Sequence, residues 1–146
     1  MLGYFSSTDI IGRERDIALS RLESRNLGKE WFQVLLAYEI GESLGTGSYG
    51  KVYKCHSRSS GKTVAIKHIS GFSKSDYDCV KLLREITILN NIQNEFFPVL
   101  YDTIIPKGVP DHIFLVTEFV ETDLRTIILT KKLSFQNVKV LLYNLL

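Results

Sequence analysis

A glycine-rich segment is the first part of the sequence whose residue types and spacing could do chemistry. Gly45, Gly47 and Gly50 follow the pattern Gly-x-Gly-x-x-Gly, in which backbone without side chains can approach the phosphates of a nucleotide. The pattern alone is weak because unrelated folds share it. The next residues, Lys-Val-Tyr-Lys-Cys-His, alternate as a strand does. We therefore expect a flexible flap between two antiparallel strands, with a plain hairpin loop as the alternative.

Two other phosphate motifs have nearly the same spacing but do not fit. The glycines of a dinucleotide-binding motif open a helix whose N-terminus holds the pyrophosphate, whereas here a strand is expected. The P-loop motif places a serine or threonine after its lysine to bind magnesium, but Val52 follows Lys51. Both interpretations are therefore disfavoured.

A lysine and a glutamate further along could complete a phosphate site. Lys67 ends the segment Val-Ala-Ile-Lys, whose period of two places Ala65 and Lys67 on one face of a strand. A lysine there can pair with nucleotide phosphates, while Ala65 leaves room for a flat base. Eighteen residues later, Glu85 lies on an expected helix from which its carboxylate could reach and orient Lys67. A solvated helix glutamate is the alternative.

Together these segments resemble the protein kinase family. Leu-Gly-Thr-Gly-Ser-Tyr-Gly-Lys-Val, Val-Ala-Ile-Lys and Leu-Arg-Glu-Ile occur in the family's order and spacing, from about Tyr38 to Leu146. Phe-Leu-Val-Thr-Glu-Phe-Val-Glu-Thr-Asp-Leu is similar to the hinge of the mitogen-activated protein kinases. The resemblance implies an α+β fold: a protein-kinase-like N-terminal lobe with a five-stranded antiparallel sheet and one helix, then the first helices of an incomplete C-terminal lobe. Residues 1–37 would be an N-terminal extension and 38–146 the incomplete kinase domain.

The resemblance also implies how ATP would be held. Lys67 and Glu85 would be the catalytic ion pair, Thr117 the gatekeeper behind adenine, and Asp123 the group that reaches the ribose. Leu44, Val52 and Ala65 would sandwich adenine, and backbone groups of Glu118 and Val120 would hydrogen-bond it. The whole set of nucleotide-binding candidates is Leu44, Gly45, Thr46, Gly47, Ser48, Tyr49, Gly50, Lys51, Val52, Ala65, Lys67, Thr117, Glu118, Val120 and Asp123.

The residues that transfer a phosphoryl group are missing from these 146 residues. Transfer needs an aspartate to orient the attacking hydroxyl, and an asparagine and an aspartate to hold magnesium. In the family they come from a His-Arg-Asp loop and an Asp-Phe-Gly motif, which would follow Leu146. Mg²⁺ is therefore expected for the family, but its protein ligands are absent, and we expect this chain alone to be inactive. The alternative function is a lone lobe that binds nucleotide weakly or docks on another protein.

Periodicity predicts the elements that position these residues. Strands are expected at 38–44, 51–56, 63–68, 96–103 and 113–119, with an amphipathic helix after the polar segment 73–78. A short helix is expected at 123–129, and Ser134 should cap a last helix that ends in mid-stripe, as if its continuation were lost. Residues 1 to about 30 fit helix templates loosely, and the apolar patch at 31–36 should dock on the domain. The resemblance further implies that Leu89 and Leu100 are the upper residues of a hydrophobic spine that links the two lobes. These leucines and the apolar stripe of the last helix would be left exposed and would favour aggregation or a partner.

Composition limits the classes of partner that the chain is expected to bind. The 18 lysines and arginines nearly balance 16 aspartates and glutamates and are scattered, so neither nucleic acid nor a membrane is expected as a partner. Two cysteines without paired spacing favour a reducing compartment, the cytoplasm or alternatively the nucleus. His56, His68 and His112 have no ligand-like spacing, so no metal site is expected. A protein substrate or an upstream kinase is implied for full-length relatives.

Overall fold

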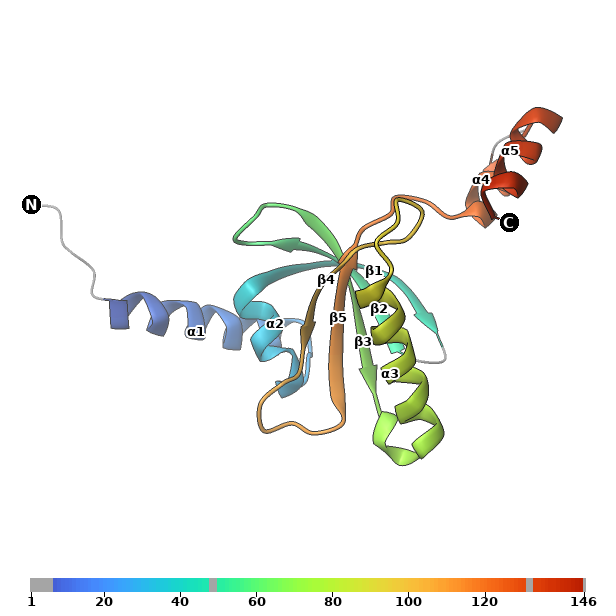
Figure 1. Ribbon diagram of the computed structural model, residues 1–146. Coiled ribbons are helices and arrows are strands. Elements are labelled where there is room, and N and C mark those ends of the chain that lie inside the picture. Colours follow the sequence, from blue (N-terminus) through green and yellow to red (C-terminus); the bar gives the residue numbers. More distant parts are fainter. Residues whose placement is uncertain (1–6, 48–49, 131–132, 146) are drawn as a thin grey trace, which may run out of the picture.

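The computed structural model describes residues 7–47, 50–130 and 133–145, which form a five-stranded sheet between helical layers (Figure 1). The strand order is β1-β2-β3-β5-β4, and every neighbouring pair is antiparallel, which confirms the predicted fold class. The elements are α1 (Ser7–Ser24), η1 (Lys29–Trp31), α2 (Phe32–Ala37), β1 (Tyr38–Gly47), β2 (Gly50–Ser57), β3 (Thr63–Ser70), η2 (Phe72–Lys74), α3 (Asp76–Asn91), β4 (Leu100–Ile104), β5 (His112–Glu118), α4 (Leu124–Thr130) and α5 (Phe135–Leu145).

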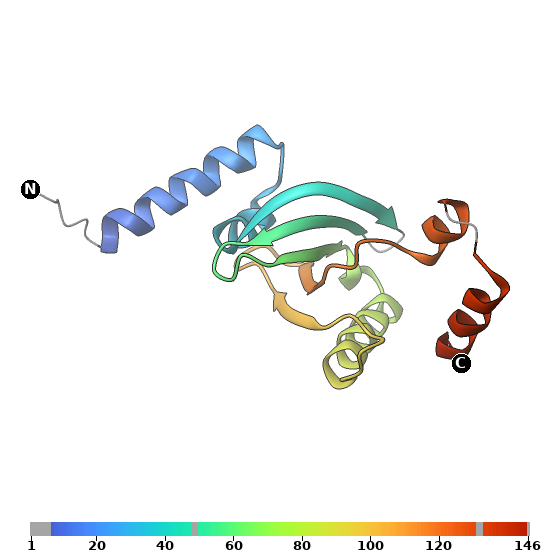
Figure 2. The same ribbon diagram turned by 90° about the horizontal axis from the view of Figure 1, so that it is seen from above.

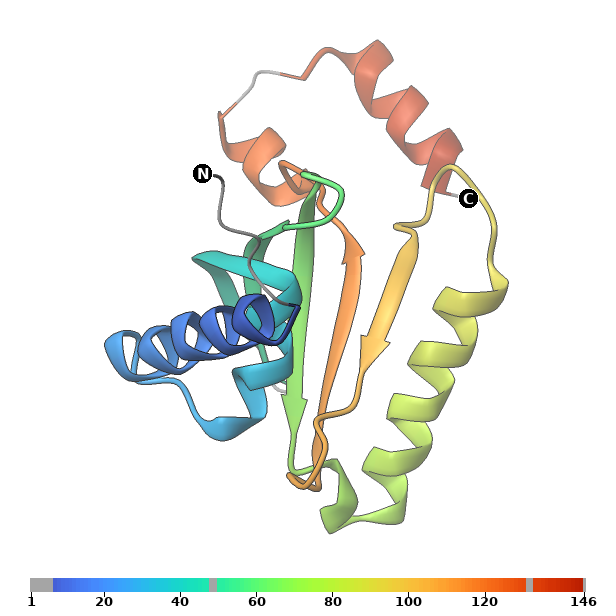
Figure 3. The same cartoon turned by 90° about the vertical axis from the view of Figure 1, so that its left-hand side faces the viewer.

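Different helices pack on the two faces of the sheet: α2 and the C-terminal part of α1 on one side, and α3 on the other (Figure 3). We name them the outer face and the inner face. Strand β3 alternates between them as predicted: Val64 and Ile66 are buried on the outer face, and Ile69 is buried on the inner face with Ala65 and Lys67. The outer-face core consists of Ala18, Leu22, Trp31, Val34, Leu35, Ile40, Cys55, Val64, Ile66, Phe114 and Val116.

Helix α3 packs on the inner face through a narrow apolar stripe. Leu82 is its buried residue, in one cluster with Ile69, Ile113 and Leu115 of the sheet. The helix begins where its polar start signals predict, because the Ser75 hydroxyl accepts a hydrogen bond from the Asp78 N–H at 3.2 Å. Because Leu82 packs on the sheet, the other side chains on the same side of α3 also point toward the sheet.

The N-terminal segment packs on the outer face. Trp31, Val34 and Leu35 are buried there, so the predicted docking of the apolar patch is confirmed.

Helix α1 is more regular than its sequence indicated. Only Ala18 and Leu22 of its described side chains belong to the core, and this narrow contact explains why helix templates fitted loosely.

Strand β4 begins at Leu100, later than the predicted start at residue 96. Asn94 closes a turn instead, since its side-chain oxygen accepts the Phe96 N–H at 2.9 Å and its carbonyl accepts the Phe97 N–H at 3.0 Å. Pro98 follows without an N–H group to donate to a ladder. The prediction at this position was wrong because side-chain turn chemistry outweighs the strand propensity of two phenylalanines.

Helices α4 and α5 extend away from the sheet beyond an extended segment (Figure 2). Ser134 caps α5 as predicted, accepting the Asn137 N–H at 3.2 Å. The apolar stripe of these helices lines a groove of about 690 Å³ whose side chains include Val138, 37% exposed, and Leu145, 76% exposed. The predicted exposure of this stripe is therefore observed.

The two cysteines are free thiols. Cys55 is fully buried, and burial raises the pKa of its thiol to about 11. Cys79 is half-buried and donates to the Phe72 carbonyl at 3.2 Å. Within the part of the chain that the structure describes, no helix has the length and apolar character needed to cross a membrane.

Candidate functional site

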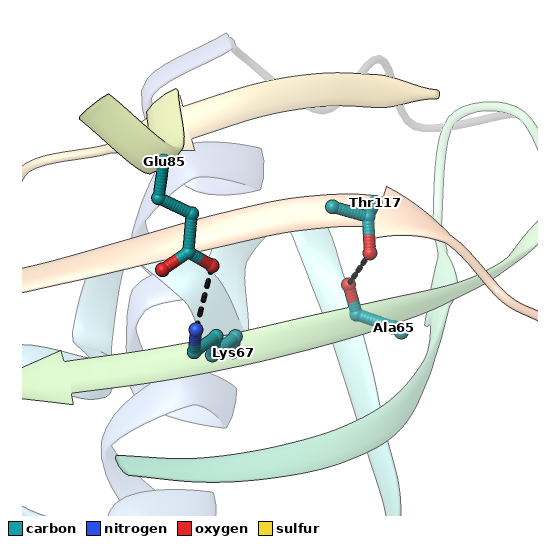
Figure 4. A network of polar contacts seen from close by, with 4 residues as sticks. All are labelled: Ala65, Lys67, Glu85 and Thr117. Atoms are coloured by element: carbon teal, nitrogen blue, oxygen red, sulfur yellow. Dashed lines mark hydrogen bonds and ion pairs between the residues drawn. The ribbon is translucent and has the colours of Figure 1, made fainter. Parts of the chain in front are cut away.

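An ion pair between β3 and α3 lies at the centre of the candidate site (Figure 4). The Lys67 Nζ donates to Glu85 Oε1 at 2.6 Å, and the two side chains are 27% and 37% exposed. The packing of Leu82 below it turns Glu85 toward the strand. Because the pair is partly exposed, solvent screens its contribution to stability. It holds the Lys67 ammonium group on the inner face of the sheet.

Strand register places three of the predicted adenine-site residues, Val52, Ala65 and Thr117, on the same face as Lys67. Val52 lies directly opposite Lys67, and Ala65 lies opposite Thr117. The Thr117 hydroxyl points to the Ala65 carbonyl at 3.5 Å (Figure 4). Leu44, in β1, is 44% exposed and follows a register shift in that strand. Small and apolar side chains therefore form a platform beside the ion pair.

The glycine-rich segment joins β1 to β2 as predicted. Gly45 pairs with Val52, Thr46 with Lys51, and Gly47 with Gly50, while Ser48 and Tyr49 lie outside the described residues. Lys51 is not brought to the platform. It lies opposite His68, and therefore on the outer face.

The predicted hinge follows β5 and leads into α4. The Glu118 N–H donates to the Val99 carbonyl at 2.8 Å, so the group of Glu118 that can serve a base is its carbonyl. Val120 is 62% exposed. The Asp123 carboxylate accepts the Thr126 N–H at 2.7 Å, and this hydrogen bond lowers the pKa of the carboxyl group. An ionised Asp123 thus caps α4 at the end of the hinge.

The two residues that the resemblance assigned to a spine, Leu89 of α3 and Leu100 of β4, both line a cavity of about 700 Å³. Both are half-buried, so they are less exposed than expected. Their role in a spine stays a prediction.

A second group of polar side chains, on the outer face, was not predicted. Glu30, His68 and His112 come from η1, β3 and β5, and one ligand atom from each lies within 4.8 Å of the others. Burial, followed by the neighbouring His112, lowers the pKa of His68 to about 4, although Glu30 acts in the opposite direction. The sequence did hold one sign of the histidine pair, because strand alternation puts His68 and His112 on the same face as Ile66 and Phe114. No spacing rule connects Glu30 to the two histidines.

Comparison with known proteins fits the geometry of the inner face. The family model described as "Protein kinase domain" matches residues 38–146, and the chain therefore belongs to the protein kinase family. A mitogen-activated protein kinase of Aspergillus fumigatus is 32% identical over 117 residues, and mitogen-activated protein kinase 2 of Pneumocystis carinii is 33% identical over 117 residues. Extracellular signal-regulated kinase 1 of Candida albicans is 32% identical over 123 residues.

These alignments cover 79% of this chain but only 33%, 33% and 28% of the respective relatives. The chain thus spans about a third of the length of the curated relatives it matches. The predicted resemblance to the mitogen-activated protein kinases is confirmed.

Proposed function

We propose that this chain forms the ATP-binding part of a serine/threonine protein kinase similar to the mitogen-activated protein kinases. The complete domain would transfer the γ-phosphate of ATP to serine or threonine residues of proteins. The Lys67–Glu85 ion pair at 2.6 Å carries the proposal, because it fixes a cation on the inner face beside a platform of small side chains. Residues 38–146 would be the incomplete kinase domain and residues 1–37 an N-terminal extension, whose buried side chains between Ala18 and Leu35 pack on the outer face.

Each part of the nucleotide would meet a different element. The phosphates would lie between the glycine-rich segment and Lys67. Adenine would lie between Val52 and the hinge, where it would form hydrogen bonds with the Glu118 carbonyl and with the backbone of Val120. Asp123, held ionised at the start of α4, would accept a ribose hydroxyl hydrogen bond. Magnesium would arrive with the nucleotide, since the side chains that hold it in the family are not in this sequence.

Replacing Lys67 by methionine is expected to weaken ATP binding about tenfold, or about 1.4 kcal/mol. Methionine keeps most of the length of the side chain but removes the charge that pairs with phosphate. Titration of the purified chain with a fluorescent ATP analogue measures the effect. Glu85→Gln should give a smaller loss of ATP affinity, because the Lys67 ammonium group remains but an ion pair no longer holds it in one position.

The matched control is Lys62→Met, at an exposed position in the turn between β2 and β3. It removes the same charge from the chain without touching the inner face. Equal affinities of the Lys62→Met and Lys67→Met variants would contradict the proposed site.

The 146-residue chain is expected to bind ATP without transferring its phosphate. No group in the sequence corresponds to the aspartate that would orient an attacking hydroxyl. Incubation with radiolabelled ATP and a generic protein substrate tests this, and label on the substrate above the level seen with Lys67→Met would contradict it.

A second candidate function is a non-catalytic module that binds nucleotide or another protein. The exposed apolar groove of α4 and α5 favours it, since such surfaces pack on a partner. ATP binding is expected under both functions, so the oligomeric state separates them: a monomeric chain in scattering experiments would count against a protein-binding module. For the full-length protein, we propose protein substrates and an upstream kinase as partners, and the cytoplasm or nucleus as the location.

A further inference from the structure

The outer face carries a cluster of three potential metal ligands, on the opposite side of the sheet from the proposed nucleotide site. His68 belongs to the strand that carries Lys67, but alternation directs its side chain to the opposite face. His68 Nε2 and His112 Nδ1 are 3.0 Å apart. Glu30 joins them from η1, the short helix that also carries the buried Trp31. All three side chains are half-buried.

The spacing of these atoms is close to that of a metal site. Zinc binds imidazole nitrogen at about 2.0–2.1 Å, so two nitrogens of a tetrahedral site lie roughly 3.3 Å apart. A small opening of the 3.0 Å pair, together with rotation of the two rings, would admit the ion. Two imidazoles and one carboxylate form a ligand set that zinc uses elsewhere, with water in the fourth position.

The surroundings hold the ligands in position. Trp31 packs edge-on against the His68 ring at 5.1 Å between centroids, and Phe114 stacks on it at 4.5 Å. The Glu30 carboxylate lies so close to Gly28 that a Cβ atom there would overlap it, so glycine leaves the space that the carboxylate occupies. Lys51 is the nearby cation and opposes binding, whereas the charge of Glu30 favours it.

We propose that Glu30, His68 and His112 bind one zinc ion, which fastens the N-terminal segment to strands β3 and β5. A simple hydrogen bond between His68 and His112 uses one proton and gives the Glu30 carboxylate no part in the interaction. A divalent ion uses all three groups at once and compensates the negative charge of Glu30. The ion would therefore stabilise the contact between residues 28–31 and the sheet, on the face opposite ATP.

The test is a titration of the metal-free chain, purified without a histidine tag, with Zn²⁺ by calorimetry and with Co²⁺ by visible absorption. We expect one equivalent to bind, d–d absorption bands typical of tetrahedral cobalt, and slower hydrogen exchange of amides in residues 29–37. Glu30→Gln and His112→Gln should each weaken Zn²⁺ binding by about tenfold or more.

His56→Gln is the matched control, because His56 is exposed and pairs with the Thr63 hydroxyl at 3.1 Å, away from the cluster. Its zinc affinity should equal that of the unmodified chain. Glu30→Gln is isosteric and keeps the fold testable if the histidine variant unfolds. Absence of stoichiometric binding, or a Glu30→Gln variant that binds zinc as tightly as the unmodified chain, would overturn the proposal.

Discussion

Trp31→Ala is expected to lower the free energy of unfolding by about 3–5 kcal/mol. The indole is 3% exposed and packs against Tyr53 and Phe114 with ring centroids 5.1 and 4.7 Å apart. Removing it leaves a cavity at the junction of three strands and loses these edge-on aromatic contacts. Because a domain of this size is stable by only roughly 5–15 kcal/mol, the loss is a large share of the total. Urea denaturation followed by circular dichroism measures it.

Leu36→Ala is the control for this substitution. Leu36 lies in α2, the helix that directly follows Trp31, but it is 39% exposed, so its truncation should cost less than about 1 kcal/mol. The comparison tests whether residues 31–35 are part of the core or only an appendage to it. If Trp31→Ala unfolded at the same urea concentration as Leu36→Ala, the N-terminal segment would contribute little to the stability of the sheet.

The inner face was predictable because its signals are local or spaced by a known motif. Alternation in Val64–Lys67 alone separates the buried side of β3 from the side with the lysine, and Glu85 follows at a separation of 18 residues. Such patterns reflect the period of the strand and of the helix, and these do not depend on the rest of the chain. The packing of α3 on the inner face, with Leu82 as its buried residue, brings Glu85 to Lys67.

The outer face was less predictable because its contacts join distant segments. Trp31 contacts β2, β3 and β5, and only the register of those strands brings Tyr53, His68 and Phe114 together beneath it. His68 and His112 are 44 residues apart in the chain. No local pattern predicts which strand lies next to β3, so the cluster with Glu30 became visible only in three dimensions. For the same reason, histidine spacing in the sequence could not indicate that His68 and His112 lie side by side.

Gly50→Ala is expected to destabilise the chain by about 3 kcal/mol or more, even without nucleotide. Gly50 has φ of +143°, a conformation that residues with side chains rarely adopt. A Cβ atom there would overlap the His68 carbonyl oxygen of β3, and backbone cannot move aside as a flexible side chain could. The clash would separate β2 from β3 next to the position where Val52 faces Lys67. Thermal unfolding of the nucleotide-free chain measures the loss.

Gly47→Ala is the matched control, since Gly47 pairs with Gly50 across the hairpin and a Cβ atom added there would meet no described atom within 4 Å outside its chain neighbours. Its melting temperature should remain close to that of the unmodified chain, whereas its ATP affinity is expected to fall. The two glycines would thus have separable roles: Gly47 would give backbone access to phosphate, whereas Gly50 permits the close approach of β2 and β3. A Gly50→Ala variant that melts normally and only loses ATP affinity would show that flexibility of the flap, not strand packing, requires glycine at this position.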